Sequence, residues 1–281
     1  MEIESLFNAR RVDELFQRQS DQEITDTLAG LGRSSDGIDR SRFSNTAIAI
    51  ERLLGHPDYQ SPNRSDPFAP FGRFRGRHII GTGTRVLDGV YLGHRAREAI
   101  FVDSSSRVLR ALCGSFIENR FSVIRTRFIN GDIQLDITRE GLVQTFQSGL
   151  PEALFQYTKK CLPYNEHKTS DVFRQAKIEP DAELSLDAYL IAQTGVCRHM
   201  VLFLVGMFEL LSQIDLTHGS MSVCRCYIPN FFSHAWARFE QEGTGPIILD
   251  PAQNFFGTLE NGGEMGKFVY DHELAKFLSA E

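Results

Sequence analysis

The chain has 281 residues, of which 42% are hydrophobic and 23% are charged, and its formal net charge at pH 7 is −6. This balance is typical of a globular protein and excludes a disordered chain, while the negative charge argues against wholesale binding to nucleic acid. The longest apolar run is far too short to cross a bilayer, so no membrane span is predicted.

Five cysteines occur, an odd number without regular spacing: Cys113, Cys161, Cys197, Cys224 and Cys226. A disulfide framework is therefore not predicted. The first residues, Met1 to Glu4, show neither a basic segment nor an apolar one, so no cleavable secretory signal is visible. We expect a protein of a reducing, cytoplasmic compartment. Export as an effector, by a route without such a signal, stays open.

Residues 1–75 are predicted to form an N-terminal helical region followed by a linker rich in Arg and Pro. A helix is expected over about 45–54, and the prolines of the following segment oppose regular structure over 57–76. Near the end of this linker Arg73, Arg75 and Arg77 alternate with other residues. They indicate either a patch for phosphate or acidic partners or, the reading we favour, a solvated linker that enters an edge strand.

Residues 76–281 are predicted to form a second, larger domain. It should begin with short strands around 79–80, 86–92 and 100–102, and continue with a helix over 104–118. Alternating apolar residues on both sides of Asn130-Gly131 predict a β-hairpin over 121–138. Helical spacing returns at 142–146 and 154–160.

The last third of the chain has the strongest patterns. A helix or turn is expected over 181–193 and a long buried helix over 197–213, because the apolar run of residues 200–208 leaves that helix no polar face. Strands are predicted at 221–228, 232–239 and 247–249, and a final helix at 265–278. The expected fold class is α+β, with a helix packed on an antiparallel sheet.

Cys197 occupies the start of that buried helix, within Gly195-Val196-Cys197-Arg198-His199. A helix N-terminus carries partial positive charge and unpaired N–H groups, which favour the reactive thiolate over the thiol. The same N–H groups can bind the oxyanion that forms when sulfur attacks a carbonyl. Cys197 is therefore a candidate nucleophile.

Two further residues follow Cys197 in an order that suggests a mechanism. His234 lies in a strand pattern, and Asp250 ends the next one. Alone, a histidine among aromatics is more often a core residue, and an aspartate before proline is commonly a turn former. Since a short turn joins the two strands, antiparallel pairing can bring His234 and Asp250 together. The three residues then supply a nucleophile, a base and an orienting carboxylate.

Three short motifs, Gly195 to His199, His234-Ala235-Trp236 and Leu249-Asp250-Pro251, resemble those of the transglutaminase-like superfamily of papain-like cysteine enzymes. The first is especially similar to bacterial members and to related domains attached to some plant kinases. The resemblance covers about residues 181–260. It implies a helix on an antiparallel sheet, with Cys197 as nucleophile, His234 as base and Asp250 as orienter. It also implies thioester chemistry at an amide.

Other residues near these motifs have less certain roles. The oxyanion hole is predicted to use the backbone N–H of Cys197 and the side-chain amide of Gln193, although Gln193 could equally face solvent. The resemblance places Trp236 where an aromatic often lies near the substrate, with packing as the alternative. Arg198 is expected to pair with a carboxylate at the helix start, and His199 to pack.

The leading hypothesis is therefore a cysteine-dependent acyltransferase or deamidase that acts on glutamine side chains of a protein substrate, without metal or cofactor. One alternative is a cysteine protease of the same superfamily that cleaves a peptide bond. Another is a catalytically idle binding module, and a weaker one is an adaptor that uses the three arginines. The N-terminal region is expected to select a partner protein.

Overall fold

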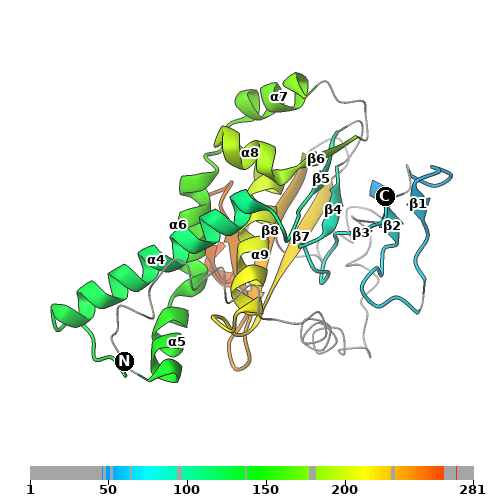
Figure 1. The fold of residues 1–281 in the computed structure, drawn as a ribbon. Helices are drawn as coiled ribbons and strands as arrows, with labels where there is room; N and C mark the ends of the chain where they lie inside the picture. Colours follow the sequence, from blue (N-terminus) through cyan, green and yellow to red (C-terminus); the bar gives the residue numbers. More distant parts are fainter. Residues whose placement is uncertain are drawn as a thin grey trace.

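In a computed structural model of the chain, the described residues are 46, 49–50, 53–63, 65–93, 97–136, 138–176, 182–228, 232–262 and 270. They form a mixed α+β structure in which two sheets and several helices surround one central helix (Figure 1). The predicted fold class is confirmed at this level. The predicted helices over residues 1–45 and 265–278 lie outside the described residues, apart from Tyr270, which is helical.

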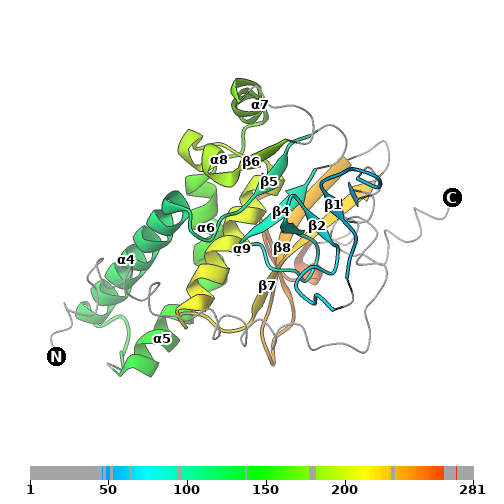
Figure 2. The same cartoon turned by 45° about the vertical axis from the view of Figure 1, so that its right-hand side comes forward.

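The central helix is α9 (Cys197–Gln213), which has the bounds that the sequence predicts. Twelve of its residues are buried, including every residue from Met200 to Phe208. A helix that is apolar on all sides is stable only when neighbours cover all of it. The second sheet covers one side of α9, and helices α4 (Arg107–Ile129) and α6 (Leu150–Cys161) cover another (Figure 2). The sulfur-bearing N-terminus is thus held by the largest core of the protein.

The second sheet is antiparallel throughout, with strand order β10-β9-β8-β7. Its strands are β7 (Ser220–Ile228), β8 (Phe232–Glu240), β9 (Ile247–Asp250) and β10 (Phe255–Gly257). Successive side chains of a strand point to opposite faces. Accordingly, Ala235 and Ala237 join the core around α9, whereas Trp236 packs with Cys224 and Cys226 in a separate small cluster.

The first sheet has the strand order β1-β2-β3-β4-β5-β6 and mixes parallel with antiparallel pairs. Its strands are β1 (Tyr59–Gln60), β2 (Arg73–Phe74), β3 (Arg77–Ile79), β4 (Gly89–Leu92), β5 (Ala99–Phe101) and β6 (Glu183–Ser185). The expected irregular segment 57–76 therefore contains two short strands. β2 lies before the domain boundary predicted at residue 75 and β3 lies after it, and the two strands pair within one sheet.

β4 is shorter than the strand predicted over 86–92. The N–H groups of Val86 and Leu87 donate to the carboxylate of Glu209 on α9, at 2.6 and 2.8 Å. Donors that are used in this way are not available for a strand ladder, so residues 86–88 form a turn.

The remaining described helices are α4 (Arg107–Ile129), α5 (Arg139–Gln147), α6 (Leu150–Cys161), α7 (Glu166–Gln175) and α8 (Leu186–Ala192), with a 3₁₀ helix, η3 (Leu259–Gly262). α5 and α6 confirm the helical patterns at 142–146 and 154–160, and α8 confirms the helical part of 181–193. No described helix is both long and apolar enough to span a membrane.

The predicted hairpin over 121–138 is wrong. The helix that precedes it continues as α4 to Ile129. The Asn130-Gly131 pair ends the helix instead of turning a hairpin: Gly131 has φ +78°, its N–H donates to Phe128 O, and Asp132 N–H donates to Arg127 O. These two bonds define a Schellman helix stop. Alternation from Val123 onwards was misleading because this end of α4 is mostly exposed.

Candidate active site

Cys197 is the first residue of α9, and the loop before it is tightly defined. Gln193 ends α8 in a left-handed conformation with φ 50°. Gly195 then pairs with Tyr164 through an isolated parallel bridge. A Cβ on Gly195 would lie 3.0 Å from the Cβ of His199, so a larger residue there would force the first turn of α9 to move. The backbone before the sulfur therefore has little freedom.

His234 and Asp250 meet through the pairing of β8 with β9, which places Ala237 opposite Leu249. The Nε2 atom of His234 is hydrogen-bonded to Oδ2 of Asp250. Asp250 is fully buried, and it also accepts the N–H of Gln253 at 3.1 Å and the hydroxyl of Tyr270 at 2.8 Å. Because the carboxylate accepts the hydrogen bond of Nε2–H, Nδ1 is the imidazole nitrogen left for a second partner.

That second partner is Cys197, since the imidazole of His234 lies close enough to the thiol to lower the pKa of the sulfur. The structure thus brings together all three residues that the sequence predicts as nucleophile, base and orienter. We call Cys197, His234 and Asp250 the Cys–His–Asp cluster.

Electrostatics within this cluster favour a thiolate and an imidazolium. Burial raises the pKa of the Cys197 thiol, but the hydrogen bond and charge of His234, together with the charge of Arg198, lower it below its ordinary value. Burial lowers the pKa of His234, but hydrogen bonds to Asp250 and Cys197, and their charges, raise it to about 10. Both shifts therefore favour transfer of the proton from the sulfur of Cys197 to the imidazole of His234.

A second charged group braces the same turn of α9. Arg198 is expected to pair with a carboxylate, and its partner is Glu98, a buried residue just before β5. The hydroxyl of Tyr189 donates to the same Glu98 oxygen at 3.0 Å. His199 accepts the Val196 N–H through Nδ1 at 3.1 Å, which is the back-bond that a capping box uses at a helix start. We call Glu98, Tyr189, Arg198 and His199 the Glu98 cluster.

His199 lies 3.4 Å from Glu98 but is not its ion-pair partner. Burial, followed by the positive charge of Arg198, lowers the pKa of His199 to about 3. The neutral ring therefore directs its Nε2–H towards a carboxylate that Arg198 already neutralises. The prediction that His199 packs rather than reacts agrees with its complete burial.

Two further predicted site residues are Gln193 and Trp236. Gln193 is exposed on the approach loop, and its part in an oxyanion hole stays a prediction. Trp236 is only 1% exposed, and its ring packs beside His234 and against Tyr270. This burial favours the packing role over contact with a substrate.

Three residues at the site are not indicated by the sequence reasoning. Tyr91 lies in β4 and Glu98 lies just before β5, and no local motif marks them. Tyr91 is buried beneath the guanidinium of Arg225, 4.5 Å from its ring centre, and the charge of Cys197 acts on its hydroxyl. Tyr270 lies within a segment predicted only as a helix. All three reach the site through tertiary contacts.

The arginine patch is not a free cationic surface. Arg73 pairs with Asp66 at 2.9 Å, Arg75 with Asp58 at 2.9 Å, and Arg77 with Glu183 at 3.7 Å. Each charge is therefore matched by a nearby carboxylate, and the phosphate-binding or adaptor alternative stays a prediction. The reading as an edge-strand entry agrees with β2 and β3.

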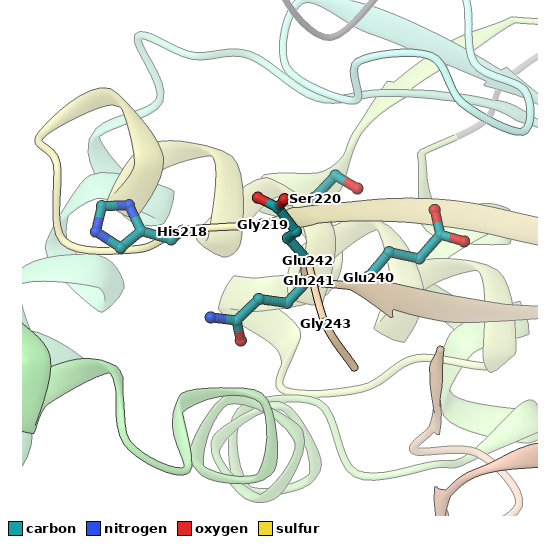
Figure 3. A pocket seen from close by; sticks show the side chains of 7 residues that line it. All are labelled: His218, Gly219, Ser220, Glu240, Gln241, Glu242 and Gly243. Carbon is teal, nitrogen blue, oxygen red and sulfur yellow. The ribbon is translucent and has the colours of Figure 1, made fainter. Parts of the chain in front are cut away.

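Two other kinds of site were searched for over the described ranges. No group of three or more His, Cys, Asp or Glu side chains there could hold a metal ion. A shallow depression lies at the far end of the β7–β8 hairpin and is lined by His218, Ser220 and Glu240, among others (Figure 3). Glu240 is six residues from His234, or about 20 Å along an extended strand. The depression is therefore separate from the Cys–His–Asp cluster.

In comparisons with protein-family models, with curated proteins and with solved structures, nothing matches this chain.

Proposed function

We propose that this protein is a cysteine-dependent acyltransferase that acts on amides of a protein substrate, with the glutamine side chain as acyl donor. The observation that carries the proposal is the placement of Cys197 at the start of α9 beside a histidine that Asp250 holds by a hydrogen bond. The lowered pKa of the thiol and the raised pKa of the imidazole agree with this arrangement. The resemblance of the three motifs to transglutaminase-like enzymes supports the choice of an amide as the target.

In the first half-reaction the thiolate of Cys197 attacks the carbonyl carbon of the donor amide. Charge develops on the carbonyl oxygen, where the N–H of Cys197 can donate at the start of α9, since the N–H groups of His199 and Met200 are already bonded to Val196 O. His234 gives its proton to the amide nitrogen as the C–N bond breaks and ammonia leaves. The product is a thioester on Cys197 and a neutral imidazole held by Asp250.

In the second half-reaction an amine or water attacks the thioester. His234 accepts a proton from the attacking group, the C–S bond breaks, and the thiolate–imidazolium pair is restored. An amine gives a new amide, whereas water gives glutamate. If the donor is instead a peptide bond, the same steps amount to proteolysis, which is the alternative of the same superfamily.

Mass spectrometry of test proteins incubated with a labelled primary amine distinguishes these reactions. Amine incorporated at glutamine, or glutamine converted to glutamate, supports the proposal, and a cut chain supports the protease alternative. Cys197→Ala should abolish the reaction. Cys161→Ala is the matched control, because Cys161 is a free cysteine outside the cluster.

The proposal fails if Cys197→Ala reacts at the wild-type rate. It also fails, in favour of the idle binding module, if iodoacetamide labels Cys197 of the wild type no faster than Cys161 near neutral pH.

A further inference from the structure

The segment between α6 and α7 runs beside the loop that carries the nucleophile. Gly195 N–H donates to Pro163 O at 3.3 Å, and Asn165 N–H donates to Gly195 O at 3.0 Å. These two bonds enclose Tyr164 and fix its backbone against Gly195. Bridged residues of neighbouring strands lie about 5 Å apart, and Cys197 is only two residues further along. Tyr164 is therefore a fixed neighbour of the sulfur.

The side chain of Tyr164 is oriented and accessible at the same time. It is 47% exposed, in contrast to Tyr91 and Tyr189, which are buried near the same turn. Its hydroxyl donates to Oε1 of Glu166, the first residue of α7, at 2.6 Å. An exposed aromatic ring with a carboxylate at its hydroxyl end therefore lies beside the reactive cysteine.

This pair has the chemistry of a cation site. The face of an aromatic ring attracts an ammonium group, and a carboxylate adjacent to the ring adds a charged acceptor. The alkyl stem of a lysine side chain can pack along the ring while its charged end reaches the carboxylate. A glutamine side chain is neutral and gains little from such a site. The chemistry thus matches the acyl acceptor rather than the acyl donor.

We infer that Tyr164 and Glu166 bind the amine of the acyl acceptor, a lysine side chain or a small primary alkylamine, and so direct the thioester towards transamidation. The inference rests on the proposed function and adds its second substrate. The bound ammonium first loses one proton to solvent through Glu166, and the resulting neutral amine attacks the thioester carbon. As the C–N bond forms, the second proton passes to Nδ1 of the neutral His234, the C–S bond breaks, and Cys197 leaves as thiolate.

The test separates the two half-reactions. Initial rates of labelled pentylamine incorporation into a glutamine peptide are measured against amine concentration, and ammonia release is measured without amine. Tyr164→Ala and Glu166→Gln should each raise the KM for the amine about five- to tenfold, since such contacts contribute on the order of 1 kcal/mol. Ammonia release without amine and the KM for the peptide should not change.

Two controls sharpen the test. Tyr164→Phe keeps the ring but frees Glu166, so its effect should be smaller than that of Tyr164→Ala. Glu152→Gln removes an exposed carboxylate from the first turn of α6 and should leave the amine KM unchanged.

An unchanged amine KM in both variants overturns the inference, as does a rise in the KM for the peptide instead. Ammonia release without any amine incorporation by the wild type also overturns it, while the proposed thioester chemistry survives as deamidation. If the wild type shows neither ammonia release nor amine incorporation, the proposed function itself is refuted.

Discussion

Two histidine–carboxylate pairs meet the first turn of α9, and their charge states are opposite. Next to Asp250 the pKa of His234 is raised to about 10, whereas next to Glu98 the pKa of His199 is lowered to about 3. Burial disfavours the charged form of both rings, so burial does not explain the difference. The difference lies in the third group of each cluster.

In the Glu98 cluster the third group is Arg198, whose positive charge neutralises Glu98 and repels a second proton. In the part of the chain that the structure describes, the other donors to Asp250 are neutral, namely Gln253 N–H and Tyr270 OH. Among these described residues the negative charge of Asp250 is therefore not neutralised by another cation and raises the pKa of His234, and the thiolate of Cys197 acts in the same direction. One cluster is arranged for proton transfer, and the other fixes the helix start.

The largest expected effect follows from removing the charge of Asp250. Asp250→Asn keeps the size of the side chain but has one acceptor oxygen in place of two and no charge to stabilise the imidazolium, so kcat/KM should fall about 10²- to 10⁴-fold. Its pH dependence provides a direct readout. In the wild type the lowered thiol pKa keeps iodoacetamide labelling of Cys197 fast as the pH drops below the ordinary thiol range. In Asp250→Asn the labelling profile should move to higher pH.

Asp171→Asn is the control for this change, since Asp171 pairs with Arg174 on the exposed side of α7. An unchanged labelling profile in Asp250→Asn would show that Asp250 does not set the charge of His234.

The second prediction concerns stability. Glu98→Gln leaves the side chain of Arg198, which is only 11% exposed, without its partner. Breaking a buried ion pair in this way should lower the free energy of unfolding by about 3 kcal/mol. Urea denaturation at neutral pH measures the loss. Asp250→Asn should lose less stability than Glu98→Gln, and the reverse order would contradict the division into a reactive and a bracing cluster.

The smallest effect is expected at Tyr270. Tyr270→Phe removes one hydrogen bond to Asp250 and keeps the ring contacts with Trp236 and Phe255. Loss of a single bond of this kind should reduce kcat/KM about three- to tenfold. Tyr157→Phe is the matched control, because it removes a hydroxyl that donates to Leu112 O, away from the cluster. If both variants lower kcat/KM equally, Tyr270 has no specific role in orienting Asp250.

The sequence predicts an element best where its pattern of apolar and polar residues matches the burial of those residues in the fold. The bounds of α9 follow from a continuous apolar run, and strands β7, β8 and β9 follow from short runs bounded by turn residues. The stretch around Asn130-Gly131 shows the limit. The same two residues suit a hairpin turn or a helix stop, and continuation of α4 without a partner strand decides between them.

The sequence by itself determined that Cys197 begins a buried helix and that a histidine and an acid follow it in two strands. Only the tertiary structure decided which carboxylate Arg198 and His199 meet. Asp250 reaches His234 through local strand pairing, which a short turn makes predictable. Glu98 is about one hundred residues distant in the chain from Arg198 and reaches it only because the first sheet packs beside α9. The charge of a buried histidine depends on all the charges around it, and those come from segments that local patterns do not connect.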